Sequence, residues 1–465
     1  MTRIISLFLV GTVCTIGILF YLLGLQKDPN HFKGEGIAFK NVNVLPMTSD
    51  SVLINYTVVI KGDRIITIAK ADDITFDDDF SVIDAAGKYL LPGIGEMHGH
   101  IPPLVPPDNT PRYMTPEYLE HTLFLYTAAG VTTVRNTLNW PNHLNLKALI
   151  KSGDIFGPNL YLAGPGLSGS SVISERGAID MVKKQYAEGW DFLKIRTGLT
   201  LAEYDAISKT AKELGISFVG HVPTDVGLIH AIESGQRTID HLEGYISYLS
   251  AFKKEDRAEK LHEVIELTKE NNVWIVPTLA LWENLLGVIS IDTLKSYEEL
   301  QYIPQDLLLR YIAWEEKNMA LKTQYNLIED RVQADARIML LSEMNKAGVN
   351  ILLGTNAPQL FSVPGFSIHR EFALMEQAGM TPYEIIKTGT TNVGQFFIDE
   401  DKFGTITLGA RADLILVDEN PFIDLNNLKL LQGVMVSGQW MSHELISHNL
   451  NVIKDIYNDK TDPIN

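Results

Sequence analysis

Between residues 94 and 355 the sequence alternates short apolar, β-branched runs with longer segments of helical periodicity. Strands that alternate with helices predict a parallel sheet in an α/β fold, and this number of runs suits a closed (β/α)8 barrel, the TIM barrel. Two of the intervening helices are expected at Leu201–Leu214 and Gly227–Ser234. The runs are GIGEMH, GVTTVRN (130–136), NLYLAGP (159–165), DFLKIR (191–196), SFVGHV (217–222), RTIDHL (237–242), NVWIVPT (272–278) and NILLGT (350–355).

The segments on either side of this region have a different pattern. Residues 38–90 and 400–445 contain alternating β-branched segments, as in Val52–Ile60 and FGTITLGARADLILVD. This alternation is typical of antiparallel strands, so we expect one composite β-sandwich built from both flanks. The barrel then occupies residues 91–399, with a helical, aromatic-rich insertion at about 283–345. Such an insertion either packs as a helical layer or forms a lid over a substrate pocket.

The N-terminus is apolar. Arg3 is followed by Ile4–Leu25, a run of twenty-two residues without a charge. That length suffices to cross the hydrocarbon core of a bilayer, so residues 1–26 are interpreted as a signal anchor or transmembrane helix. Arg3 favours a cytoplasmic N-terminus and an extracytoplasmic catalytic domain. The alternative is a cleaved export signal, which would make the protein periplasmic or secreted.

Composition excludes some functions. The chain has 39 Lys and Arg against 57 Asp and Glu, a formal charge of −18, which argues against nucleic acid as a partner. Its only cysteine, Cys14, lies in the apolar run, so neither an intrachain disulfide nor a zinc–thiolate site can form. Self-association as a homo-oligomer is neither indicated nor excluded.

Several strand-like runs end in histidine: His98, His100, His221 and His241. His98 and His100 are two residues apart, so on a strand both imidazoles point to the same side. The carboxyl ends of barrel strands meet at one mouth, and histidine is the commonest metal ligand. Any one of these residues could be a hydrogen-bonded rim histidine, but their equivalent positions together predict a metal site.

Lys194 lies inside another of these runs, FLKI. A lysine in such a place normally extends to solvent or pairs with an acid such as Asp191. Burial beside cations, however, disfavours the ammonium form. A neutral amine can add carbon dioxide to form a carbamate, whose two oxygens could bridge two metal ions.

At this point the sequence resembles the amidohydrolase superfamily, in its imidazolonepropionase-like and prolidase-like branch. The motifs that carry the resemblance, from about residue 38 to 441, are LLPGIGEMHGH, GVTTVRN, DFLKI, FVGHV, TIDHLEG, LLGTNAP and FGTITLGARADLILVDENP. The resemblance implies the barrel and the composite sandwich, with two divalent metal ions, usually Zn²⁺. It further implies that His98 and His100 hold one ion, that His221 and His241 hold the other, and that carboxylated Lys194 bridges them.

Asn356 in LLGTNAP departs from this pattern, because the family has a metal-binding, proton-accepting aspartate there. An amide oxygen can contact a metal weakly, but the group cannot take a proton at working pH. Three interpretations stay open: a natural slow or inactive variant, an engineered aspartate-to-asparagine form, or a chain in which another base serves.

Two further residues are candidates for substrate contact. Arg196 shares a strand face with Lys194 and could bind a carboxylate, and Tyr245 follows the His241 strand end and could hydrogen-bond an oxyanion. The sequence therefore predicts a metal-dependent amidohydrolase that acts on a small amide, such as a cyclic amide or an X-Pro-like dipeptide. The alternatives are an inactive metal-containing protein that binds a small amide, and a mononuclear deaminase.

Overall fold

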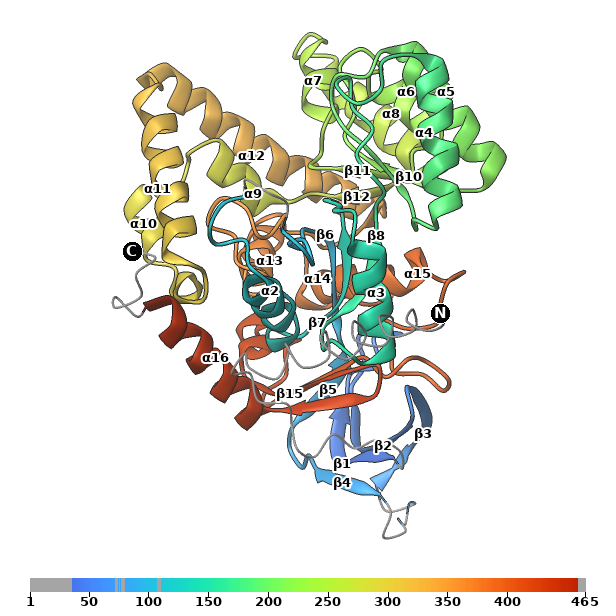
Figure 1. Cartoon of the computed structure of the whole chain (residues 1–465), viewed down its shortest axis with the longest axis vertical. Coiled ribbons are helices and arrows are strands. Elements are labelled where there is room, and N and C mark those ends of the chain that lie inside the picture. The colour runs from blue at the N-terminus through green and yellow to red at the C-terminus, as the bar shows by residue number, and fades with distance from the viewer. Residues whose placement is uncertain (1–35, 72–73, 75, 77–79, 107–109, 459–465) are drawn as a thin grey trace, which may run out of the picture.

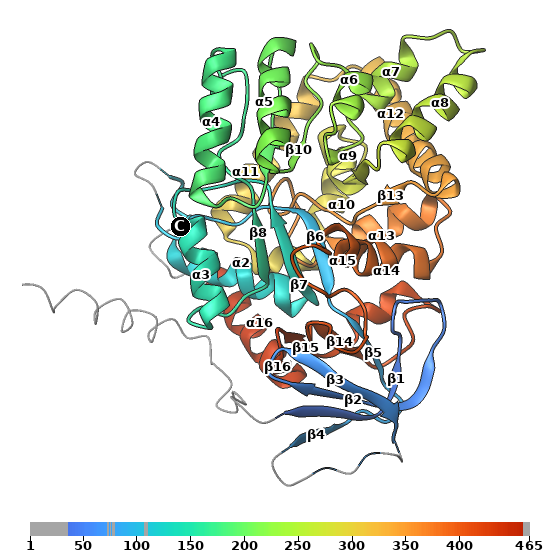
Figure 2. The ribbon, with the colours of Figure 1, turned by 90° about the vertical axis from the view of Figure 1, so that its right-hand side faces the viewer.

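A computed structural model describes residues 36–458, except 72–73, 75, 77–79 and 107–109. A barrel with surrounding helices forms the upper part of the molecule, and a β-sheet domain lies below it (Figures 1 and 2). Among the described residues, no helix combines the length and the apolar character needed to cross a membrane. The expected anchor, residues 1–26, lies outside the described residues.

The central region contains parallel strands in two groups. One group has the order β6-β7-β8 and the other the order β13-β12-β11-β10-β9. The strands are β6 (Ile94–Gly99), β7 (Val131–Asn136), β8 (Asn159–Leu162), β9 (Leu193–Ile195), β10 (Phe218–Gly220), β11 (Thr238–Asp240), β12 (Trp274–Val276) and β13 (Asn350–Ile351). The expected parallel α/β arrangement is confirmed.

Backbone contacts join the two groups into a ring. Bridges from Ala163 to Phe192 and from Leu167 to Ile195 connect the β8 side to β9. On the opposite side, the Met97 N–H donates to the Leu353 carbonyl at 2.8 Å, which connects β6 to the residues after β13. The ring therefore closes as in a (β/α)8 barrel, and the carboxyl ends of all its strands face one mouth.

Helices cover the barrel between successive strands. Their ends have ordinary local causes: in α5, Thr200 and Glu203 form a capping box at the start, and Gly215 adopts a left-handed conformation (φ 73°) at the end. The helices are α2 (Pro116–Ala128), α3 (His143–Ser152), α4 (Glu175–Glu188), α5 (Leu201–Leu214), α6 (Leu228–Glu233), α7 (Tyr245–Ser250), α8 (Arg257–Glu270), α13 (Ile368–Gln377), α14 (Pro382–Gly389) and α15 (Thr391–Phe396).

The long connection between β12 and β13 is helical. It contains α9 (Leu279–Leu285), α10 (Ile291–Lys295), the 3-10 helix η3 (Glu298–Tyr302), α11 (Gln305–Ala320) and α12 (Gln324–Ala347). These helices form a lobe on one side of the barrel mouth, opposite the lobe that carries α4 to α8 (Figure 1). The insertion is therefore placed where it can shape a pocket at the mouth.

Both flanks contribute strands to one connected sheet. Its order is β16-β15-β14-β5-β1-β2-β3, with β4 paired to β1. The sheet has its own core, which includes Phe39, Val58, Leu90, Leu414 and Met435. The strands are β1 (Ile37–Val44), β2 (Leu53–Lys61), β3 (Arg64–Lys70), β4 (Ser81–Asp84), β5 (Tyr89–Pro92), β14 (Leu414–Val417), β15 (Leu431–Val436) and β16 (Gln439–Ser442), followed by α16 (His443–Asn458), with the 3-10 helix η4 (Leu425–Lys429) between β14 and β15.

Candidate metal centre

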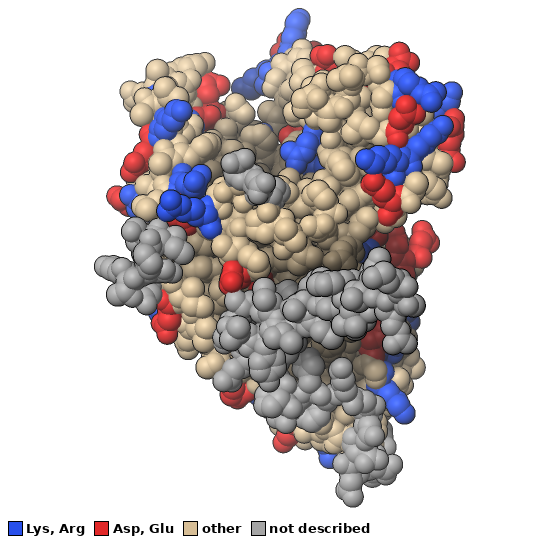
Figure 3. Space-filling view, in the orientation of Figure 1, with Lys and Arg blue, Asp and Glu red and all other residues tan. Residues whose placement is uncertain are grey.

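One cavity at the barrel mouth, of about 460 Å³, is lined by all of the predicted metal-binding side chains. They are His98, His100, Lys194, His221 and His241. The ring centroid of His98 lies 4.4 Å from that of His241 and 5.5 Å from that of His100, and His221 lies 5.0 Å from His241. The surface is hollowed between the two lobes above the mouth (Figure 3). Residues that are far apart in sequence thus share one site.

The strand register explains this convergence. Val219 of β10 pairs with Lys194 of β9, and Gly220 pairs with both Ile195 and Ile239. His221 therefore directly follows β10, two residues beyond the level of Lys194. Gly220 has a φ of +122°, and a Cβ there would lie 2.6 Å from the Ile195 carbonyl oxygen and 2.9 Å from Lys194 Cδ. Only glycine leaves room for the lysine to cross the strand end at this point.

Burial favours the neutral form of three of the histidine rings. Burial lowers the pKa of His98 and of His241 well below the usual value, and that of His100 to about 4. His221 Nδ1 lies 2.8 Å from Glu243 Oε1, His241 Nδ1 lies 2.7 Å from Thr278 Oγ1, and His98 Nδ1 lies 2.9 Å from Asp240 Oδ2. Metal-binding histidines commonly hold a second partner through one nitrogen in this way, which leaves the other nitrogen for the ion.

Asn356 contacts His100, the remaining histidine of the site. Its Oδ1 lies 2.8 Å from His100 Nε2, and its Nδ2 donates to Gln359 Oε1. The residue has a left-handed φ of 63°, and its N–H donates to the His98 carbonyl at 2.8 Å. The asparagine amide is therefore fixed against His100 inside the cavity, where it can accept a hydrogen bond but cannot accept a proton.

Asp240 is the centre of a buried charge network that the sequence analysis missed. Lys194 Nζ donates to Asp240 Oδ2 at 2.9 Å, and the Arg135 guanidinium donates to Oδ1 at 3.0 Å. Although burial alone would raise it, Lys194 and Arg135 hold the pKa of Asp240 well below its usual range. Burial lowers the pKa of Lys194, and the aspartate opposes that shift. Asp240 directly precedes His241, so its position at a strand end was the signal that could have identified it.

The donor types fit a metal centre. Four imidazoles and a buried amine around one cavity are nitrogen ligands that suit zinc and related divalent ions. Within the described residues, no three His, Cys, Asp or Glu side chains stand together in an arrangement that could hold an ion as they lie. Lys194 is turned onto Asp240 and His100 onto Asn356. Ion binding would therefore require these two side chains to exchange their present contacts for the ion.

The two predicted substrate contacts have different outcomes. Arg196 lines the cavity. Tyr245 does not: it begins α7, is fully buried, and its hydroxyl lies 2.8 Å from Thr268 Oγ1 of α8. The prediction of Tyr245 as a substrate contact is corrected, because the helix start turns its side chain away from the cavity and into the packing between α7 and α8.

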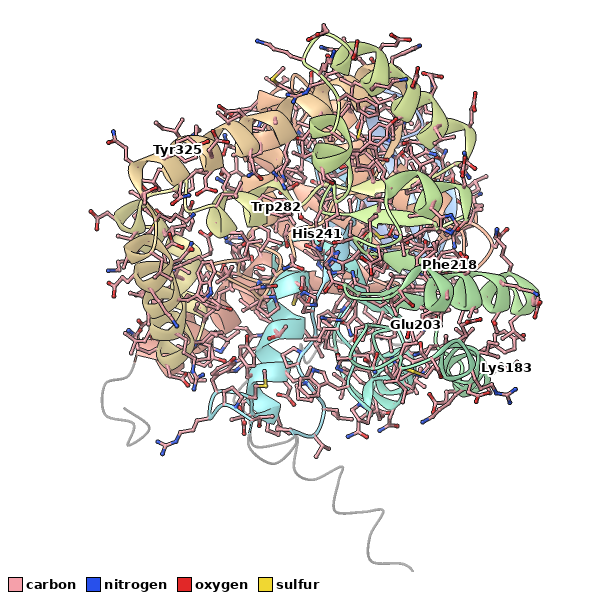
Figure 4. The ribbon with its side chains drawn as sticks, turned by 90° about the horizontal axis from the view of Figure 1, so that it is seen from above. Lys183, Glu203, Phe218, His241, Trp282 and Tyr325 are labelled. Atoms are coloured by element: carbon pink, nitrogen blue, oxygen red, sulfur yellow. The ribbon has the colours of Figure 1, made fainter. Side chains whose placement is uncertain are left out.

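Other cavity residues were also missed. Glu243 is the sole Asp or Glu among the described residues that line the cavity. Trp282 of α9 donates from Nε1 to the His241 carbonyl at 2.8 Å, and the guanidinium carbon of Arg337 from α12 lies 3.6 Å from the Trp282 ring centroid. Figure 4 shows Trp282 and His241 close together near the middle of the molecule, seen from above. Sequence spacing carries no signal for this contact, because the insertion folds back over the mouth through tertiary packing.

The chain was compared with known proteins. The family model described as Amidohydrolase family matches residues 89–441. A 5-methylthioadenosine/S-adenosylhomocysteine deaminase from Caldanaerobacter subterraneus subsp. tengcongensis is 24% identical over 442 residues, which cover 91% of this chain and 94% of the deaminase.

Solved structures share the fold. A Xaa-Pro dipeptidase with bound methionine has a TM-score of 0.67 at 22% identity, and the match covers 88% of this chain and 100% of the dipeptidase. The bottromycin amidohydrolase has a TM-score of 0.71 at 18% identity, with 90% of each chain covered. At these identities the likeness concerns the fold.

Proposed function

The chain belongs to the amidohydrolase family of carbon–nitrogen bond hydrolases, and from that premise we propose that it is a metal-dependent hydrolase of a small amide, either a cyclic amide or an X-Pro-like dipeptide. The observation that carries the proposal is the convergence of His98, His100, Lys194, His221 and His241 on one cavity at the barrel mouth. Strand ends of such a barrel are where catalytic groups collect.

The proposed centre holds two divalent ions, with zinc as the expected metal. His98 and His100 would hold one ion, His221 and His241 the other, and a carboxylated Lys194 would lie between them. Ions bound there would polarise the substrate carbonyl and lower the pKa of a bound water. Glu243 and Thr278 would keep His221 and His241 in the correct tautomer and orientation, through the contacts they already make.

Elemental analysis of purified protein tests the centre. We expect two equivalents of divalent metal per chain. One equivalent would favour the mononuclear deaminase instead, and a chain that retains no stoichiometric metal would contradict the proposal.

Asn356→Asp tests the chemistry. Asn356 contacts His100 but cannot take a proton, so we expect the substitution to supply the missing base and to raise kcat by about 10²–10⁴-fold on a panel of cyclic amides and dipeptides. Asn350→Asp at the start of β13 is the matched control, because Asn350 bonds Asn272 outside the cavity and should leave kcat unchanged. Released amine is the measurement.

A second candidate function follows from Asn356 itself. A chain without a proton acceptor at this position could bind a small amide without turnover. No gain in activity for Asn356→Asp, combined with measurable binding of an amide from the panel, would favour that function. High activity of the unaltered chain would instead assign proton transfer to another group, and Glu243 is the carboxylate that lines the cavity within the described residues.

We also propose that the apolar segment Ile4–Leu25 anchors the chain in a membrane, with the catalytic domain on the extracytoplasmic side. The support is the length of the uncharged run and the position of Arg3 before it.

A further inference from the structure

The cavity has a polar side and an apolar side. Arg196, His221 and Glu243 follow β9, β10 and β11, which are the fourth to sixth strands of the ring counted from β6. The apolar residues come from the loops and helices after β6, β7, β12 and β13, which lie on the opposite side of the same ring. A molecule bound across the mouth therefore meets charge at one end and apolar surface at the other.

The apolar side forms an arm of the cavity, which we call the apolar arm. It is lined by side chains from the approach to α2, from α2 itself, from α9 and from α11, namely Tyr113, Tyr118, Leu285, Leu307 and Tyr311. The Tyr113 and Tyr118 rings meet edge to face at 5.4 Å between centroids. Burial raises the pKa of Tyr118 and of Tyr311 above the usual value, and Leu307 is only 4% exposed. This space, lined by apolar and aromatic side chains, favours an apolar or aromatic group.

Arg196 stands on the polar side without an acidic partner among the described residues. The two carboxylates of the site have other partners. Glu243 contacts His221, and Asp240 accepts hydrogen bonds from Lys194 and Arg135. Gly166 leaves room for the arginine, because a Cβ at that position would lie 2.6 Å from Arg196 Nε. A half-buried guanidinium with open donors in a cavity is suited to bind a carboxylate, to which it can donate two parallel hydrogen bonds.

We propose that the substrate is an N-acyl amino acid or dipeptide in which a bulky apolar or aromatic acyl half fills the apolar arm and the carboxylate of the amine half binds Arg196. The inference rests on the proposed function and specifies its substrate class. The cavity volume of about 460 Å³ lies within the range of sites for ligands of this size.

Calorimetry on the full-length, zinc-loaded chain tests the apolar arm and the Arg196 contact separately. The probes are N-acetylglycine, N-hexanoylglycine and N-hexanoylglycinamide. Each methylene that is fully buried in the arm should tighten binding by about fourfold, and the hexanoyl group has four more methylenes than the acetyl group. Burial of only two of them should therefore make the hexanoyl compound bind about tenfold more tightly than the acetyl compound, and burial of more should increase that ratio. Loss of the carboxylate in the glycinamide should weaken binding by about tenfold or more. Equal affinities for the acetyl and hexanoyl compounds, or for the acid and the amide, would overturn the inference.

Variants assign each effect to its residue. Leu285→Asp places a charge in the apolar arm and should abolish the preference for hexanoyl over acetyl, while Leu309→Asp, on the exposed side of α11 at 55% exposure, should keep it. Arg196→Met should abolish the preference for acid over amide, and Arg176→Met on the surface should keep it. If Leu285→Asp does not fold, the probe series on the unaltered chain still decides the question.

Failure of the inference is distinguishable from failure of the proposed function, because binding is measured by calorimetry and turnover by released amine. Hydrolysis of the panel without chain-length or carboxylate preference would overturn the substrate class and leave the hydrolase proposal intact. Tight, selective binding without hydrolysis, even by the Asn356→Asp variant, would support the ligand class and contradict the hydrolase proposal.

Discussion

Asp240 shows how a single buried carboxylate organises this site. It is fully buried, and its two oxygens contact Arg135, Lys194, His98 and the Thr238 hydroxyl. Arg135 is also fully buried. Ionised Asp240 therefore offsets part of the positive charge of Arg135 and Lys194, and this matters because burying unpaired cations is strongly unfavourable.

Asp240→Asn should consequently be among the most destabilising single changes at the barrel mouth. The substitution leaves the Arg135 and Lys194 charges buried without an anion, at a cost of about 3–5 kcal/mol. For a domain of this size that corresponds to a fall in Tm of roughly 6–15 °C. Calorimetric unfolding of the two proteins measures it.

Asp205→Asn is the control, because Asp205 forms an exposed pair with His230 at 2.6 Å and such pairs contribute about 1 kcal/mol or less. An Asp240→Asn protein as stable as this control would show that the buried network is not a stability determinant.

The site could be predicted only in part at this scale. His98, His100, Lys194, His221 and His241 were identifiable because each lies at or near the end of an apolar run, and barrel closure brings them to one cavity. Asp240 carries the same positional signal, but its role depends on Arg135, which lies 105 residues away in the chain. No spacing rule encodes such a partner. Tyr245 was misplaced because the direction of a side chain at a helix start depends on what packs beneath it.

At the scale of elements, Glu371 connects α13 to α9. Its carboxyl group accepts hydrogen bonds from the Leu279 N–H at 2.8 Å and the Ala280 N–H at 2.9 Å, the first residues of α9. Thr278, just before them, has a left-handed φ of 47° and contacts His241. Glu371 therefore accepts hydrogen bonds from N–H groups that would otherwise lack a partner at the start of α9, the helix that places Trp282 and Leu285 in the cavity wall.

This contact predicts a pH-dependent stability. Burial raises the pKa of Glu371 to about 8, against the effect of the two N–H donors. Between pH 4.5 and 8 the folded protein keeps a proton that the unfolded chain releases, so the contribution of Glu371 to stability is full below pH 4.5 and is lost as pH rises through 8. Glu371→Gln cannot ionise, so its stability relative to the unaltered chain should increase by roughly 3–5 kcal/mol from pH 4.5 to pH 8.

Denaturant unfolding at intervals across this pH range measures that difference. Glu376→Gln, on the exposed face of the same helix, should differ from the unaltered chain by a small and constant amount. A difference between Glu371→Gln and the unaltered chain that does not change with pH would contradict the argument.

Elements were the most predictable level of the fold. Leu201–Leu214 was predicted with the bounds that α5 has, because a capping box and a following glycine mark its ends. The barrel strands are shorter than the apolar runs suggested: β9 covers Leu193–Ile195 within 191–196, and β13 only Asn350–Ile351 within 350–355. Residues that follow a strand leave the ladder, and Arg196 after β9 places its side chain at the mouth. Hydropathy cannot separate these two roles, since both kinds of residue are buried.

At the scale of the whole molecule, sequence pattern predicted the parallel barrel but not the wall of its cavity. The alternation of strands and helices can be recognised from local sequence, and a parallel sheet that closes into a barrel follows from it. The insertion reaches the cavity through contacts such as Arg337 on Trp282, and these depend on how α9 and α12 pack. Both the barrel and the sheet from the two flanks are present in the described residues from Ile37 onward.

Membrane attachment is the remaining prediction at this scale. The run Ile4–Leu25 would be about 33 Å long as a helix, enough for a hydrocarbon core of about 30 Å. We expect the full-length chain to remain in the membrane fraction after alkaline carbonate washing, and a chain that lacks residues 1–26 to be soluble, with an unchanged Tm because the sheets and the barrel begin at Ile37. Protease added to intact cells should reach the folded domain once any outer envelope has been permeabilised, while the cytoplasmic membrane stays closed. This experiment checks on which side of the membrane the domain lies. Recovery of the full-length chain, with its N-terminus intact, in the soluble fraction would contradict the anchor, whereas loss of the first residues from the soluble protein would identify a cleaved export signal.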